Sequence, residues 1–140
     1  MNYLDTNVII YAIENHQKYG QSCKKILLDV QSNKLKVYSS VLVLVEVINV
    51  IKKINRELEK LNQKLLDIRK NIDAILSLPI IWLDIDFVTI KKASEYDYKI
   101  SGIDYIHVAT MEINSIRNII SADEDFDKVE FIKRTDPLDY

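Results

Sequence analysis

The sequence predicts an α/β fold in which helices cover both faces of a parallel sheet of four to five short strands. Two observations predict it. Short apolar segments alternate along the chain with longer segments of helical periodicity, and this alternation is typical of parallel sheets with helical crossovers. No repeat, low-complexity linker or shift in composition divides the 140 residues. We therefore expect a single domain over residues 1–140.

The strands are expected where apolar residues stand together in short runs. In chain order these runs are NYLD (2–5), KVYS (36–39), IIWLDI (80–85), RNIIS (117–121) and, as a candidate fifth strand, EFIKR (130–134). Short runs of this kind, bounded by polar residues, are typical of strands in the interior of a parallel sheet.

The first two helices follow the first strand. The segment TNVIIYAIEN has helical periodicity, and Asp5 or Thr6 stands where an N-cap residue is expected. A second helix is expected over about 18–33, before the second strand. Asp5 therefore lies at the junction of a strand and a helix.

Two later helices also begin at recognisable caps. Asp86 follows the third strand and is expected to cap a helix that runs to about Ile100. Ser101 and Asp104 then have the S-x-x-D spacing of a capping box, which opens the next helix.

Residues 40–77 predict a helical arm. The valine-rich segment SVLVLVEVINVI would also suit a strand by propensity alone. The apolar residues nevertheless recur every three or four positions, as on a helix: Val47, Ile51, Ile54, Leu58, Leu61, Leu65, Ile68, Ile72 and Ile75. A straight helix of this length would extend about 57 Å, whereas a domain of this size has a radius of gyration of only about 14 Å. We expect the helix to break near Asn55 or Asn62, or to project and pair with a second copy of the chain.

Charge is unevenly distributed, although the net charge is only −2. Residues 47–73 carry seven basic and four acidic side chains, a net charge of +3, and residues 121–140 carry seven acidic and three basic side chains, a net charge of −4. A cationic surface and a separate acidic focus are expected on the one domain. Two ordinary solvated surfaces remain the alternative explanation.

Composition excludes several classes of function. With only two glycines, Gly20 and Gly102, the chain has neither a P-loop nor a Rossmann fingerprint. No apolar run approaches the about 20 residues of a membrane span, and no basic segment precedes the first apolar stretch as in a signal peptide. The single cysteine, Cys23, can form no internal disulfide and is expected in the core. That fits a protein of the reducing cytoplasm.

Four acidic residues fall where the predicted topology brings segments together. Asp5 and Asp123 follow strands, Asp104 opens a helix, and Glu46 is the only charged residue within 37–51. Because ligands bind beyond the carboxyl ends of parallel strands, these carboxylates are expected to share one crevice. At an effective dielectric constant near 20, each pair about 5 Å apart repels by roughly 3 kcal/mol. Protons or a cation must offset this repulsion, and oxygen ligands alone select Mg²⁺ or Mn²⁺ over zinc.

Each acidic residue also has a purely structural explanation. Asp5 suits an N-cap, and Asp104 suits the first turn of a helix. Glu46 needs a partner that its own apolar segment does not supply. The aspartates that follow the fourth strand suit turns, and we expect at least one of them to serve only there: Asp123, Asp125 and Asp127.

The two histidines give weaker signals. His107 lies three residues after Asp104 on the same helical face. It could serve as a ligand or a proton carrier, but a histidine packed beside a carboxylate for structural reasons is more usual. His16 falls in an expected loop and belongs to no motif. Two histidines do not support a Ser-His-Asp arrangement.

The segments that carry these residues resemble the four motifs of the PIN-domain family, and most closely its short toxins of the VapBC type. YLDTNVIIY resembles the opening strand with its D-T-N, and VLVLVEVINV resembles the second motif, an acidic residue on a helix, here Glu46. GIDYIHVAT resembles the third motif, with Asp104. IISADEDFDKV resembles the fourth, in which a Ser or Thr precedes the key aspartate by two residues, here Ser121 and Asp123. The four motifs in order are specific, and the resemblance covers the whole chain.

The resemblance implies a three-layer α/β/α sandwich, a ribonuclease activity that depends on Mg²⁺ or Mn²⁺, frequent homodimers and neutralisation by a small antitoxin protein. It implies that four acidic residues are catalytic: Asp5, Glu46, Asp104 and Asp123. Three of them would hold the metal: Asp5, Asp104 and Asp123. Four further residues would support the site: Thr6, Asn7, Ser121 and Asp125. The lysine-rich segment from Ile51 to Ile75 departs from the family by its length.

On this basis we expect a cytoplasmic toxin that is an endoribonuclease and hydrolyses phosphodiester bonds in single-stranded or looped RNA. Lysines of the arm are expected to contact the phosphates of the RNA backbone. Two alternatives stay open. One is a receiver-type signalling module, in which Asp84 after the third strand would accept the phosphoryl group, but this leaves Glu46 unexplained. The other is a catalytically silent PIN-like protein that binds RNA or a protein partner.

Overall fold

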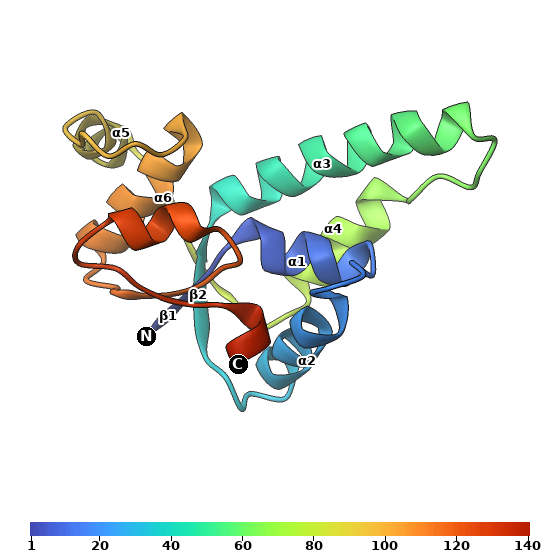
Figure 1. Ribbon diagram of the computed structural model, residues 1–140, viewed down its shortest axis with the longest axis horizontal. Coiled ribbons are helices and arrows are strands. Elements are labelled where there is room, and N and C mark those ends of the chain that lie inside the picture. Colours follow the sequence, from blue (N-terminus) through green and yellow to red (C-terminus); the bar gives the residue numbers. More distant parts are fainter.

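Five parallel strands form one sheet in the computed structural model, which describes residues 1–140 (Figure 1). The strand order is β3-β2-β1-β4-β5, and every neighbouring pair is parallel. The strands are β1 (Asn2–Leu4), β2 (Val37–Ser40), β3 (Ile81–Leu83), β4 (Asn118–Ile120) and β5 (Lys133–Thr135). The predicted α/β fold is confirmed, although β5 begins three residues after the start of the expected EFIKR segment.

Six α-helices connect the strands: α1 (Thr6–Ile13), α2 (Gly20–Gln31), α3 (Val41–Lys60), α4 (Ile68–Leu76), α5 (Phe87–Ala93) and α6 (Gly102–Ile113). Two short 3₁₀ helices follow, η1 (Glu124–Lys128) and η2 (Pro137–Asp139). The expected caps are present: Asp5, Asp86 and Ser101 accept backbone N–H groups at the starts of α1, α5 and α6. None of the helices combines the length and the apolar character needed to cross a membrane.

The prediction that the helix after Asp86 reaches Ile100 is wrong, because α5 ends at Ala93. The residues that follow pack against the second of the two core clusters described below. The hydroxyl of Tyr105, on α6, donates to the backbone carbonyl of Tyr98, and the hydroxyl of Tyr96 donates to Glu112. Tertiary contacts of these tyrosines thus take the place of further helical turns.

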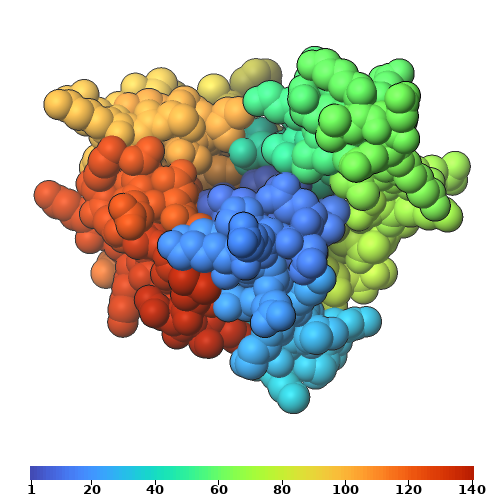
Figure 2. Space-filling view, turned by 45° about the vertical axis from the view of Figure 1, so that its right-hand side comes forward, coloured from blue at the N-terminus to red at the C-terminus, as the bar shows by residue number.

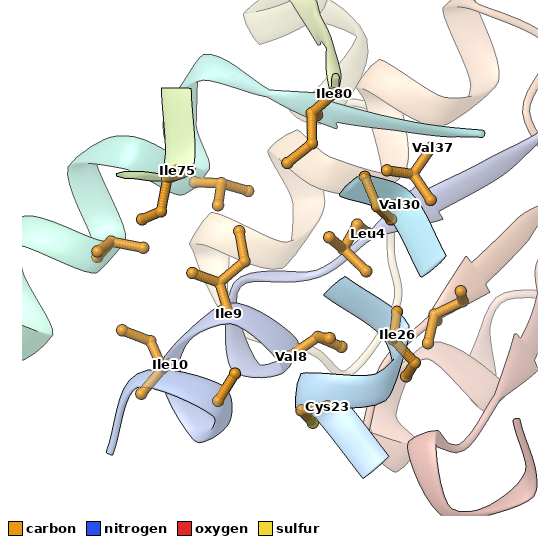
Figure 3. Packing of buried hydrophobic residues seen from close by; sticks show 14 of the residues in the cluster. Leu4, Val8, Ile9, Ile10, Cys23, Ile26, Val30, Val37, Ile75 and Ile80 are labelled. Carbon is orange, nitrogen blue, oxygen red and sulfur yellow. The ribbon is translucent and has the colours of Figure 1, made fainter. Parts of the chain in front are cut away.

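The core lies on both faces of the sheet because successive strand residues point to opposite sides. Leu4 and Ile120 belong to a cluster of 15 buried residues to which α1, α2 and α3 contribute. Figure 3 shows Leu4 packed among side chains of α1 and α2 in this cluster. Their neighbours Tyr3 and Ile119 belong to a second cluster of 8 residues with α6 and η1. Cys23 is buried in the first cluster, as predicted.

The arm is a helical pair that breaks near Asn62, one of the two expected positions. α3 ends at Lys60, Asn62 has a φ of 51°, and α4 begins at Ile68. The other candidate, Asn55, lies inside α3. Its amide fastens the returning segment, accepting from Leu66 N at 2.8 Å and donating to Leu66 O at 3.0 Å. Figure 1 shows α3 projecting away from the sheet and α4 returning toward it.

The apolar seam of the arm is divided between the core and the surface. Val47, Ile51 and Ile75 are buried in the first core cluster. Leu61 and Leu65, at the far end, are 66% and 47% exposed. The seam therefore serves the core near the sheet, and only its outer end is free for another molecule.

Candidate functional site

A cavity of about 360 Å³ opens beyond the carboxyl ends of β1 and β4 and is lined by ten residues. All four acidic residues singled out from the sequence line it: Asp5, Glu46, Asp104 and Asp123. Asp5 follows β1, Asp123 follows β4, Glu46 lies on α3, and Asp104 lies in the first turn of α6. Figure 2 shows the hollow between the blue N-terminal segment, the teal and green α3 and the orange part of the chain.

Asp5 is the most constrained of these carboxylates. It is 6% exposed, and its Oδ1 accepts Thr6 N–H at 2.7 Å. Its Oδ2 accepts the Ser121 hydroxyl at 2.6 Å and the Asn7 amide at 3.0 Å. Burial raises the pKa of Asp5, and His107 and the Ser121 hydrogen bond act against that rise. Asp5 is thus an N-cap and a wall of the cavity at once.

Asn7 and Ser121 connect β1 to the segment after β4. Asn7 Nδ2 donates to Ser121 Oγ at 3.1 Å, and Asn7 Oδ1 accepts Ala122 N–H at 3.3 Å. Ser121 is fully buried, and its Oγ accepts Asp123 N–H at 2.9 Å. These two residues therefore fix the separation of Asp5 and Asp123, which the chain places more than a hundred residues apart.

Glu46 finds its partners on two other elements. Its Oε1 accepts the Thr6 hydroxyl at 2.9 Å and lies 2.5 Å from His107 Nε2. The other ring nitrogen, Nδ1, lies 2.5 Å from the Tyr3 hydroxyl. Since that hydroxyl accepts Ser40 N–H at 3.2 Å, its own proton is available to Nδ1. Nε2–H is then left to donate to Glu46.

His107 is fully buried and holds Glu46 in place. Burial opposes a charge on the imidazole, but the Glu46 hydrogen bond and the nearby Asp5 carboxylate outweigh it, so the pKa of His107 is raised. His107 is thus a histidine packed beside a carboxylate, as the sequence favours, but that carboxylate belongs to Glu46 and not to Asp104, and its other hydrogen bond goes to Tyr3. Tyr3 was missed altogether, because nothing in its local sequence distinguishes it from any other strand residue.

The closest group of carboxylates is Asp104, Asp123 and Asp125. One oxygen of each lies within 4.8 Å of the others. Burial raises the pKa of Asp104 to about 6, with further contributions from Asp5 and Asp123. Asp125 also accepts Lys128 Nζ at 2.7 Å. An all-carboxylate group with this mutual repulsion fits a hard divalent cation.

This group differs by one residue from the expected metal-binding set. Asp104 and Asp123 belong to both, and Asp125, which was expected only to support the site, is the third member of this group. Asp5 lines the same cavity with both of its oxygens already accepting hydrogen bonds.

Two other aspartates lie outside the site. Asp127 forms a two-pronged ion pair with Arg134, whose Nε and Nη2 each donate at 3.0 Å, so it is the structural member of the aspartates after β4. Asp84 is exposed and follows the edge strand β3, with β2 between that strand and β1. A phosphoryl-accepting aspartate of a receiver module would have to stand nearer the acidic cavity.

The sequence matches a family model of the PIN domain over residues 3–132. No curated protein matches the chain by sequence.

Solved structures share the fold over nearly the whole chain. VapC20 of Mycobacterium tuberculosis, a toxin that cleaves the sarcin–ricin loop, has a TM-score of 0.69 and 19% identity, covering 94% of this chain and 97% of its own. VapBC2 of Rickettsia felis, bound to a DNA fragment of its promoter, has a TM-score of 0.68 and 18% identity, covering 96% and 98%. A toxin–antitoxin complex from Klebsiella pneumoniae has a TM-score of 0.66 and 18% identity, covering 98% of each chain.

Proposed function

The chain belongs to the PIN-domain family, and we propose from this that it is the toxin of a toxin–antitoxin pair, an endoribonuclease of the cytoplasm that uses Mg²⁺ or Mn²⁺. One observation carries the proposal. Acidic side chains from four separate segments line one cavity, and two of them, Asp104 and Asp123, form with Asp125 a group of carboxylates within 4.8 Å of one another. Such a cluster is costly for a fold that has no cation to bind.

The residues that would hold the ion are Asp104, Asp123 and Asp125, with Asp5 beside them. A bound Mg²⁺ or Mn²⁺ supplies a more acidic water and neutralises charge on a phosphate. Glu46 faces the same cavity with its orientation fixed by Thr6 and His107, so its carboxylate is placed to orient water or to accept a proton. Thr6, Asn7 and Ser121 act by holding Asp5 and Asp123 rigid, and rigid positioning is the main contribution of the protein in such a site.

The substrate we propose is RNA whose backbone extends from the cavity along the arm. The outer half of α3 and the loop after it carry basic side chains: Lys52, Lys53, Arg56, Lys60 and Lys64. Phosphate contacts of this kind are electrostatic and independent of base sequence. Homodimerisation through the exposed Leu61 and Leu65 would add the arm of a second copy to this surface.

A small antitoxin is the protein partner we propose, because three similar structures are of toxin or toxin–antitoxin proteins. The chain offers an apolar cavity of about 410 Å³ between α1, α2 and α4, in which seven of eleven lining residues are hydrophobic. It shares α1 with the acidic cavity: Ile9 and Ile13 line the apolar cavity, while Ile10 and Tyr11 line the acidic one. A partner segment lying across α1 would reach both.

The proposal is tested by cleavage of a mixed RNA pool with Mg²⁺, with Mn²⁺ and with excess chelator. Asp5→Asn should abolish cleavage without unfolding the chain, because its amide keeps the size of the carboxylate. Asp84→Asn is the matched control, since Asp84 is exposed and lies outside the cavity. Full activity in chelator, or in the Asp5→Asn variant, would sink the proposal. If acetyl phosphate labels the wild-type chain but not the Asp84→Asn variant, the receiver alternative is favoured. If no RNA is cleaved under any condition, a catalytically silent binding protein is favoured.

A further inference from the structure

Three aromatic rings cluster beside the acidic cavity. Tyr11 and Tyr19 are stacked, with ring centroids 5.3 Å apart and planes inclined by 14°. His16 packs against both, at 4.3 Å from Tyr11 and 5.4 Å from Tyr19. All three side chains are half-buried. The cluster is therefore partly open to solvent and is not a closed piece of the core.

The cluster is held rigidly by the loop between α1 and α2. His16, to which the sequence analysis gave no role, accepts Lys18 N–H at 3.1 Å and Tyr19 N–H at 3.2 Å through Nδ1. Asn15 has a φ of 52°, and Gly20 packs so closely on it that a Cβ on Gly20 would lie 2.8 Å from the Asn15 carbonyl carbon. Rings fixed in this way lose little conformational freedom when a ligand stacks on them.

One ring of the cluster belongs to the acidic cavity itself. Tyr11 lines the cavity, as does Glu14, three positions further along the chain. A phosphate is disfavoured on this wall because Glu14 would repel it, whereas an uncharged base is not. The exposed Lys18 has its Nζ 5.1 Å from the centroid of the Tyr19 ring, so the cluster also carries a cation that can contact the RNA backbone.

We propose that Tyr11, backed by Tyr19 and His16, is a stacking surface for one unpaired base of the RNA substrate, next to the phosphate that enters the acidic cavity. The assignment rests on the proposed function for the position of that phosphate. Aromatic side chains beside cationic groups are a recurrent way of binding single-stranded nucleic acid, because every base has a π face. The site accordingly selects unpaired RNA, since paired bases are already stacked.

The test measures binding of a fluorescein-labelled, single-stranded RNA octamer in Mg²⁺, with every protein in the Asp5→Asn background so that the RNA stays intact. Tyr11→Leu should weaken binding about tenfold, the effect expected from loss of one stacked base. Tyr11→Phe should bind within twofold of the parent, because stacking needs the ring and not the hydroxyl. The matched control is Tyr140→Leu: Tyr140 also carries a lysine over its ring, at 4.7 Å, but does not line the cavity.

A set of the same octamers, each with one abasic position, locates the contact. For one position in the octamer, removing the base should weaken binding to the parent protein about tenfold. Removing the same base should not weaken binding to the Tyr11→Leu variant further, because that variant has already lost the ring on which the base stacks. If Tyr11→Leu folds poorly, the binding of the abasic octamers is measured instead with the parent protein and with Tyr19→Leu. Equal binding of all octamers by the parent, or an equal loss for every octamer in the tyrosine variants, would overturn the proposal.

The outcome is separable from that of the proposed function. A chain that cleaves RNA but shows no dependence on Tyr11 or on any single base keeps the nuclease and loses the stacking surface. A chain that cleaves nothing but shows the paired loss keeps the stacking surface in an RNA-binding protein.

Discussion

Replacing Asp104 by asparagine should stabilise the metal-free protein at neutral pH. The Asp104 carboxylate lies within 4.8 Å of those of Asp123 and Asp125. At an effective dielectric constant near 20, one charged pair at this distance repels by about 3.5 kcal/mol. Lys128, 2.7 Å from Asp125, offsets part of the repulsion. The amide of asparagine keeps the shape of the side chain and removes its charge.

The gain should depend on pH in a defined direction. Burial, then Asp5 and Asp123, raise the pKa of Asp104 to about 6 from the ordinary 3.8. The folded state therefore binds this proton more tightly than the unfolded chain, so the contribution to stability is full below about pH 4 and is lost as the pH rises through 6. A difference of about two pH units corresponds to at most roughly 3 kcal/mol. Because the side chain is only half-buried, water reduces this, and we expect about 1–2 kcal/mol.

Urea unfolding in chelator, at pH 4.5 and pH 7.5, measures the effect. The Asp104→Asn variant should exceed wild type by about 1–2 kcal/mol at pH 7.5 and by much less at pH 4.5. Mg²⁺ at a hundredfold excess over its dissociation constant should stabilise wild type by about 2.7 kcal/mol and the variant by less. Asp84→Asn is the matched control, because Asp84 is exposed and directly follows the edge strand β3, outside the acidic cavity. The prediction is refuted if the variant is less stable than wild type at pH 7.5, or if its gain in the free energy of unfolding is the same at both pH values. Either result would show that these carboxylates do not repel one another.

Three further changes test the site, the loop and the arm. His107→Leu leaves Glu46 without its buried donor, so the free energy of unfolding should fall by about 2 kcal/mol. For RNA cleavage, kcat should fall by a larger factor than KM changes. Denaturation curves and kinetic constants equal to those of wild type would contradict this. Gly20→Ala places a Cβ 2.8 Å from the backbone of Asn15 and should cost about 1–3 kcal/mol, which an unchanged melting temperature would refute. Charged residues in place of Leu61 and Leu65 should yield a folded monomer with weaker RNA binding; light scattering decides, and either a monomeric wild type or a dimeric variant contradicts the expectation.

Local signals in the sequence were enough to predict most of the fold. The junction at Asp5 was predicted because an apolar strand, a cap residue and a helical period follow one another within a few positions. A break in the arm was predicted because a straight helix would be too long for the domain, but the length did not decide between Asn55 and Asn62, and only the structure places the break at Asn62. The end of α5 was not, since the segment after Ala93 has no glycine or proline to stop a helix, and it stops because Tyr96 and Tyr98 find partners on α6.

The candidate site was predictable as a set of residues and not as a set of contacts. Glu46 lacked a partner and His107 lacked a role, but the two are 61 positions apart and only the folded topology brings them together. Likewise, the spacing around Asp125 could not show that its carboxylate joins Asp104 and Asp123 while that of Asp127 turns to Arg134. Both choices depend on the path of η1, which is set by tertiary packing of Phe126 in the second core cluster.

The carboxylates of the cavity differ in how firmly they are held, and this difference bears on how the site would work. Asp5 accepts three hydrogen bonds and is nearly inaccessible. Asp104 is half-buried, and burial, Asp5 and Asp123 raise its pKa to about 6 although a hydrogen bond with Ser101 acts against the rise. The donors hold Asp5 rigidly in one wall of the cavity and offset part of the burial cost that raises its pKa. Asp104, Asp123 and Asp125 bring three carboxylates within 4.8 Å of one another, and Lys128, at 2.7 Å from Asp125, offsets only part of their repulsion. We therefore expect the affinity for the proposed ion to depend mainly on Asp104, Asp123 and Asp125, and the shape of the cavity to depend mainly on Asp5 and the polar residues that hold it.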